Sequence, residues 1–195
     1  MPLSMYQVSV PVFIQMLDGL AGCIDKALQH AARRNYDPAV LATTRLTADM
    51  MPFAQQVQVA TNHATGAPAR LAGLELPALG DDERDLDQVK GRIARALVFL
   101  RTITPRQIDG TEDKEIVLPK RARVRHIELA GLAPIAQDQY PMNLYPMTFR
   151  GQDYLLRFAM PNFYFHVTTA YNILRRAGVD IGKHDYLGQL PRVDV

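Results

Sequence analysis

Residues 162–183 read NFYFHVTTAYNILRRAGVDIGK, the pattern of an amphipathic helix followed by a stop. Asn162 and His166 share one face of that helix with its apolar residues, because positions four apart are neighbours on a helix surface. Gly178 is the residue type that most often ends a helix in the left-handed conformation. The stretch therefore predicts a core-facing helix that carries a polar pair, which is where bundle proteins place their chemistry.

Apolar residues at three- and four-residue spacing predict long helices in the rest of the chain as well. The first of these helices contains Pro11, which either kinks it or marks its true first turn. The second starts near Thr47 or Asp49 and carries Pro52 in its first turn. The predicted long helices span residues 4–34, 47–73, 81–102 and 151–177, and Gly66 and Pro68 are expected to disturb the second, so that residues 69–73 could continue it only after a kink.

Residues 103–150 differ from the helical segments because prolines and glycines recur along them. Residues 115–118 and 147–149 are expected to pair as a short hairpin. The material between them, about 120–145, is then a long loop excursion, which inside a compact domain is either functional or poorly ordered. The tail from 179 to 195 is expected to lie extended over the helices.

The whole pattern predicts one all-α domain over residues 1–195, a four-helix bundle with a minor β-hairpin between the third and fourth long helices. Hydrophobic residues make up 48% of the chain, and the net charge is only +2. This balance gives no global field that would attract nucleic acid or an anionic membrane. The lone Cys23 falls in an apolar helical pattern, so we expect it in the core. The chain shows neither a signal-peptide pattern nor an apolar run of roughly 18 residues, so the expected location is the cytoplasm.

No nucleotide-binding loop, hydrolase elbow or metalloprotease motif is present, so the candidate chemistry rests on the polar pair. Asn162 and His166 can hold one metal ion or one substrate oxygen, or they can form a satisfied polar pair in the core. A second row of polar residues could contact them. Asp49, Gln56 and His63 follow one another at seven-residue spacing and so lie near one line along the second predicted helix. If this line faces the bundle axis, Gln56 or His63 approaches His166, and otherwise the three are solvent-facing residues.

Residues 162–188, NFYFHVTTAYNILRRAGVDIGKHDYLG, resemble the C-terminal signature of an uncharacterised bacterial family, a domain of unknown function within the DinB/YfiT-like superfamily of metalloenzymes. Residues 4–17 (SMYQVSVPVFIQML), 45–60 (RLTADMMPFAQQVQVA) and 151–163 (GQDYLLRFAMPNF) are similar to the same family. The resemblance covers most of the chain except about 120–145. It implies an up-down-down-up four-helix bundle that is often dimeric.

The resemblance also implies where a metal would bind. Many superfamily members hold a divalent metal such as nickel or zinc with one histidine from the second helix and a His-x-x-x-His pair from the last. Matching the leucine and arginine that close the last helix to residues 174–175 puts His166 at the second histidine of that pair and Asn162 at the first. The third ligand falls near Gln55 or Gln56. Because amide oxygens are weak ligands for these metals, we expect an incomplete metal site around His166.

We therefore expect a DinB-like protein with a core polar pocket around His166, formed with Asn162, Gln56 and Asp49. An unknown small molecule is the expected ligand of this pocket. The first alternative is a divalent-metal- or thiol-dependent transferase or isomerase, in which His166 is a metal ligand or a catalytic base.

The second alternative is not an enzyme. It is a homodimer that serves as an interaction or stress-associated module. Phe163, Tyr164 or residues 103–150 would supply its apolar contact surface. The partner in this hypothesis is a second copy of the chain, with no role for nucleic acid or a membrane.

Overall fold

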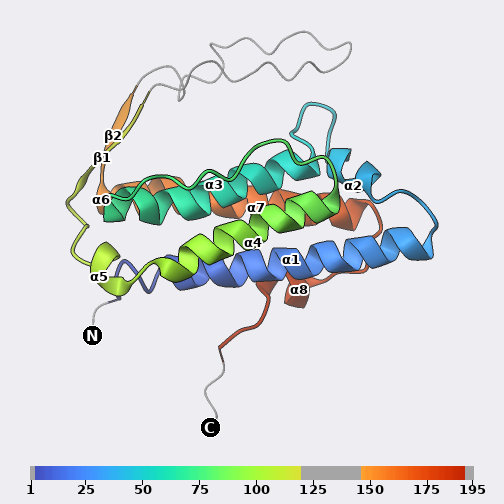
Figure 1. Ribbon diagram of the computed structural model, residues 1–195, viewed down its shortest axis with the longest axis horizontal. Helices are drawn as coiled ribbons and strands as arrows, with labels where there is room; N and C mark the ends of the chain where they lie inside the picture. Colours follow the sequence, from blue (N-terminus) through green and yellow to red (C-terminus); the bar gives the residue numbers. More distant parts are fainter. Residues whose placement is uncertain (1–2, 120–145, 192–195) are drawn as a thin grey trace.

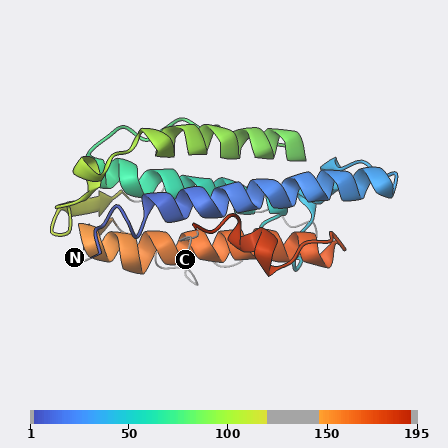
Figure 2. The same ribbon diagram turned by 90° about the horizontal axis from the view of Figure 1, so that it is seen from below.

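A computed structural model describes residues 3–119 and 146–191. This part of the chain is mostly helical and includes one two-stranded sheet. Four long helices lie side by side (Figure 1 and Figure 2), namely α1 (Val10–Arg33), α3 (Phe53–Ala72), α4 (Leu86–Thr102) and α7 (Met160–Arg176). The shorter elements are α2 (Ala39–Thr43), α5 (Pro105–Ile108), β1 (Glu115–Leu118), β2 (Met147–Arg150), α6 (Gly151–Asp153), η3 (Tyr154–Ala159) and α8 (Lys183–Leu187). None of the helices in the described ranges is long and apolar enough to cross a membrane.

The connector formed by residues 73–85 sets the direction of α4. It runs back along α3, so α4 starts beside the first half of α3 and follows the same direction (Figure 1). Arg92, near the start of α4, donates from Nε to Thr61 Oγ1 of α3 at 2.7 Å. Gly73 ends α3 with a φ of 70°, a left-handed conformation that glycine adopts without strain. The two helices are therefore parallel neighbours.

Two long helices begin later than the sequence pattern predicted, because a proline marks the start of each. The Ser4 hydroxyl accepts a hydrogen bond from the Gln7 backbone, but α1 itself begins at Val10 with Pro11 in its first turn. Pro11 therefore marks the true first turn, one of the two alternatives left open by the sequence. Likewise α3 begins at Phe53, directly after Pro52, rather than near Thr47 or Asp49.

The third predicted helix also starts later, at Leu86 rather than at Asp81 or Asp82. The Asp85 carboxylate accepts from the Gln88 backbone N–H at 2.8 Å and so caps α4. Glu83, which the sequence placed in the first helical turn, lies in the connector and is buried. Its carboxylate binds Arg92 and Gln58 instead of interacting with the N-terminal end of the α4 dipole.

The last long helix is continuous from residue 151 to 176, but it is not α-helical throughout. α6 leads into the π-helical segment η3, which leads into α7. Pro161 cannot donate a hydrogen bond and conflicts with the carbonyl group four residues before it in a regular α-helix. A π turn bonds residue i to residue i+5, so we attribute η3 to the need to bypass Pro161.

The hairpin forms as predicted. β1 and β2 pair antiparallel, with Glu115 opposite Arg150 and Leu118 opposite Met147. Gly151 follows β2 directly, and a Cβ atom there would lie 2.0 Å from the Thr111 carbonyl oxygen, so only glycine fits. The predicted excursion over about 120–145 lies outside the described residues.

The prediction of an extended tail was wrong for residues 183–187, which form α8 against α1. Gln15 Nε2 donates to the Leu187 carbonyl at 2.9 Å, and Lys26 pairs with Asp185 at 2.7 Å. A five-residue helix is too short to reveal itself by hydrophobic periodicity.

A buried polar cluster joins α4, α3 and the connector, and we name it the Arg92 cluster after its central residue. Arg92 has no exposed surface and pairs with buried Glu83 at 3.2 Å. Its Nη2 donates to Asn62 Oδ1 at 2.7 Å. Gln58 Nε2 donates to the Glu83 carboxylate at 2.9 Å. Most of the remaining core is apolar, as in the edge-to-face contact of Phe13 in α1 with Phe163 in α7, whose ring centroids are 4.8 Å apart.

Candidate functional site

α3 and α7 pack along one another (Figure 1), and each contributes side chains to the candidate site. Gln56 lies in the first turn of α3 and is buried, whereas His63 lies two turns later and is half-buried. His166 and Asn162 lie on α7 and are also half-buried. The interface between α3 and α7 therefore brings together residues that are more than 90 positions apart in the sequence.

A direct hydrogen bond joins Gln56 and His166. Gln56 Oε1 lies 2.7 Å from His166 Nδ1. Gln56 Nε2 donates to the Met51 carbonyl at 3.1 Å, which fixes the orientation of the amide. Since an amide oxygen can only accept, Nδ1 of His166 must carry the proton. The neutral imidazole then has its lone pair on Nε2.

His63 is the residue that the sequence analysis did not include in the pocket. Its ring stacks on the ring of His166, with centroids 6.2 Å apart and an interplanar angle of 12°. The seven-residue step from Gln56 to His63 was the available signal, because it keeps both on one helical line. Spacing alone could not show which way that line faces. The structure turns both residues towards His166.

Asn162 lies one turn before His166, but its side chain serves its own helix. Its Nδ2 donates to the Phe158 carbonyl at 2.7 Å, across the end of the π segment. The structure thus places Asn162 beside the site, on the face that the sequence predicted. Its amide nitrogen helps to satisfy a carbonyl group near the irregular turn.

Asp49 does not belong to the same group. It is exposed, and it accepts from the Thr47 hydroxyl at 2.6 Å, a bond that lowers the pKa of the Asp49 carboxyl. The prediction that Asp49, Gln56 and His63 share one helical line required a helix starting near residue 47. Because α3 starts only at Phe53, Asp49 lies outside the helix and away from that line.

One side of the site is aromatic. Phe158 contacts the edge of His63, with ring centroids 5.7 Å apart. Phe149 of β2 and Tyr154 pack on Phe158 in turn, at 5.5 and 6.0 Å. The hairpin and the π segment therefore form an apolar wall beside the two imidazoles. We name Gln56, His63 and His166 the His166 cluster.

The three-histidine metal centre of the superfamily does not fit this donor set. Within residues 3–119 and 146–191, no group of three or more His, Cys, Asp or Glu side chains could hold a metal ion. The cluster offers two imidazoles, while Gln56 Oε1 accepts from His166 and Asn162 Nδ2 is engaged within its own helix. Nickel and zinc prefer imidazole and thiolate to neutral amide oxygen. No reaction step is therefore assigned to a metal.

Cys23 supplies no thiolate to this region. It is buried in α1, and burial, together with the charge of Asp185, raises the pKa of its thiol to about 12. The thiol therefore stays protonated at neutral pH and behaves as a core residue, as the sequence predicted.

Comparison with known proteins agrees with the resemblance seen in the sequence. The family model for the domain of unknown function DUF1993 matches residues 5–141 and 134–187. A crystal structure of a DinB family member protein from Shewanella denitrificans is 31% identical, and the match covers 97% of this chain and 95% of that chain with a TM-score of 0.78. No curated protein matches the chain. The chain belongs to the DUF1993 family, a domain of unknown function with a DinB-like fold.

Proposed function

We propose that this protein is a cytoplasmic, DinB-like four-helix bundle of up-down-down-up connectivity that binds a small polar molecule at His166 without a metal ion. The observation that supports this function most is the 2.7 Å contact between His166 Nδ1 and Gln56 Oε1. An amide carbonyl here fixes the tautomer and the ring orientation, as second-shell partners of functional histidines do. Gln56 is itself held by the Met51 carbonyl, so the arrangement is preorganised.

The chemistry of this arrangement follows from the tautomer. With the proton on Nδ1, Nε2 is the basic nitrogen of the neutral His166 ring. A general base in this role typically accelerates a reaction by about 10²–10⁴-fold. The aromatic wall at Phe158 suits an apolar portion of the same molecule, and His63 adds a second polar ring.

Metal analysis of protein purified without a histidine tag tests this proposal, together with nitrogen NMR of the imidazole rings. We expect less than about 0.1 nickel or zinc ion per chain, because the donor set lacks the third strong ligand. We also expect His166 to be protonated on Nδ1 when neutral, with the His166→Ala variant identifying its signals. Near-stoichiometric metal that disappears in His166→Ala would overturn the metal-free proposal, as would a neutral ring protonated on Nε2.

The pairing of His63 with His166 favours one competing function, a divalent-metal- or thiol-dependent transferase or isomerase. Two imidazoles with centroids 6.2 Å apart could share in binding a metal if a further ligand came from a substrate. A reactive thiol would also have to come from a substrate, since Cys23 is buried. A stoichiometric metal in the measurement above would support this function.

A homodimer is a second proposal, and two exposed hydrophobic residues of α7 and η3 support it. Phe165 is 57% exposed and Leu156 in η3 is 42% exposed. Phe163, one of the surface residues suggested by the sequence, is instead fully buried against Phe13. Light scattering should show a dimer that Phe165→Ser weakens and that Val98→Ser, a change at an exposed apolar residue of α4, does not. A concentration-independent monomer would refute this assembly.

A further inference from the structure

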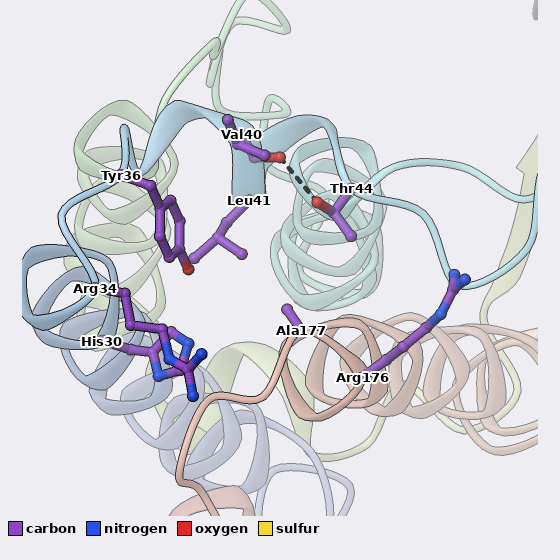
Figure 3. Close-up of a pocket in the computed structure, with 8 residues that line it drawn as sticks. All are labelled: His30, Arg34, Tyr36, Val40, Leu41, Thr44, Arg176 and Ala177. Atoms are coloured by element: carbon purple, nitrogen blue, oxygen red, sulfur yellow. Dashed lines mark hydrogen bonds between the residues drawn. The ribbon is translucent and has the colours of Figure 1, made fainter.

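A hollow lies at the opposite end of α7 from its proline, where the last turns of α1 and α7 meet α2 (Figure 3). Its volume is about 670 Å³, within the range of small-molecule sites. Ala177 follows α7 directly and is eleven residues after His166, which is roughly 16 Å along a helix. The hollow is therefore separate from the His166 cluster.

His30 forms part of this hollow and is almost completely buried, with 6% of its surface exposed. Its ring packs edge-on against Tyr36, with centroids 6.1 Å apart. Among the described residues no side chain or backbone group is hydrogen-bonded to the His30 ring, and no fully enclosed polar side-chain atom lacks a partner. The ring nitrogens of His30 must therefore reach the hollow rather than the packed core.

Two further polar groups point into the same space. Arg34 and Tyr36 both line the hollow, and Figure 3 shows the Tyr36 hydroxyl directed towards the opening between α1 and α7. Within the described part of the chain, neither side chain forms a hydrogen bond or an ion pair. Arg176 also lines the hollow, but it donates to the carbonyl groups of Arg45 and Leu46 and is turned away.

The charge of the hollow is positive. No carboxylate is among its lining residues, and Arg34 carries a full charge. The carbonyl groups at the end of α1 oppose this charge only weakly, because the Arg34 backbone N–H caps them. Leu41 and Ala177 add an apolar surface to the remainder of the wall.

We propose that this hollow binds a small organic anion, with a carboxylate or phosphate head on Arg34, His30 and Tyr36 and an apolar body against Leu41. A guanidinium presents paired N–H donors that match such a head group, and a phenol hydroxyl can donate a further bond. The buried, unbonded imidazole is the feature that a purely structural role leaves unexplained.

NMR titration of the full chain with phenyl phosphate and with benzoate tests this site, with neutral benzamide as the reference probe. We expect saturable shifts at the ends of α1 and α7 for at least one anion, with a dissociation constant below about 10 mM, and none for benzamide. Arg34→Gln should weaken the binding at least about tenfold, because it removes the charge-assisted bonds. Which anion binds more tightly identifies the head group.

Arg33→Gln is the matched control, since Arg33 is the adjacent exposed arginine of α1 and does not line the hollow. It removes the same charge from outside the hollow, where solvent screens it, so it should change the affinity less than about twofold. Equal weakening by both variants would show general charge attraction and overturn the site. The absence of saturable binding by either anion to the folded protein would overturn it as well. Tyr36→Phe should weaken binding while the amide spectrum shows an unchanged fold.

Discussion

Two polar clusters lie along α3, and they differ in how far their central side chains are enclosed. In the Arg92 cluster, the central guanidinium has no exposed surface, and Nε, Nη1 and Nη2 all donate to protein oxygens. In the His166 cluster, Gln56 is buried but the rings of His63 and His166 are only half-buried. The Arg92 guanidinium is enclosed, although its partners Asn62 and Asp81 are exposed, whereas the two rings of the His166 cluster lie along a partly open seam.

This difference shows that charge is a poor guide to function in this fold. Arg92 and Glu83 form a buried ion pair, yet their contacts serve to hold α4 and the connector against α3. A buried ion pair is expensive to form and is tolerated when its hydrogen bonds are complete. The His166 cluster contains no carboxylate or guanidinium and retains ring surface that a ligand could reach, so the proposed function is placed there.

Replacing Arg92 with methionine should produce the largest loss of stability. The change leaves the buried Glu83 carboxylate without its main charge partner, which typically costs about 3–5 kcal/mol. The free energy of unfolding in urea measures the effect. The urea concentration at the midpoint of unfolding should be clearly higher for His166→Ala than for Arg92→Met if only the Arg92 cluster is essential for stability.

Arg95→Met is the matched control for this experiment. Arg95 contacts the same Glu83 carboxylate at 3.3 Å, but its side chain is 53% exposed. An exposed ion pair contributes less than about 1 kcal/mol, so the variant should be nearly as stable as the natural chain. If Arg92→Met and Arg95→Met lost the same small amount, the distinction between the two clusters would fail.

The long helices could be predicted from sequence because each buries a continuous apolar stripe. Their first residues could not, since Pro11 and Pro52 are equally compatible with a kink and with a first turn. Arg92 lies between Val89 and Ile93 on α4 and would ordinarily be read as a solvent-facing charge. It is buried only because the connector returns along α3 and covers it, and no local pattern encodes that path.

The candidate site shows the same limit. Helical spacing placed Asn162 and His166 on one face and made Gln56 a possible neighbour. The rotation of α3 against α7 decided that Gln56 and His63 both turn inward, and that rotation depends on packing across the whole interface. Asp49 lies away from Gln56 and His63 because α3 starts at Phe53, later than the sequence pattern predicted.

His166→Ala should have a smaller effect than Arg92→Met. It removes the donor to Gln56 Oε1, and a buried acceptor left unpaired costs about 1–3 kcal/mol. Because the rings are half-buried, water can reach part of the gap, so we expect about 1 kcal/mol in urea unfolding. A double-mutant cycle with Gln56→Leu should assign most of that loss to the pair. An additive cycle would show that the two side chains do not depend on each other.

The acid dependence of the unfolding free energy should show the smallest effect, and it should differ between variants of the two clusters. Burial raises the pKa of Glu83, but hydrogen bonds from Gln58 and the backbone, together with the charge of Arg92, outweigh burial and hold that pKa below its usual value of 4.5. A carboxyl whose pKa is lowered by folding stabilises the protein at neutral pH, because the unfolded chain takes up the proton first as the pH falls.

Stability should therefore decline as the pH falls below about 4.5 and through the lower pKa of folded Glu83. Glu83→Gln removes the titrating group, so its unfolding free energy should fall less steeply between about pH 5 and pH 3. The His166 cluster contains no carboxyl group, so His166→Ala should keep the steep acid decline of the natural chain. If Glu83→Gln kept that decline and His166→Ala lost it, the structural and the functional roles assigned to the two clusters would have to be exchanged.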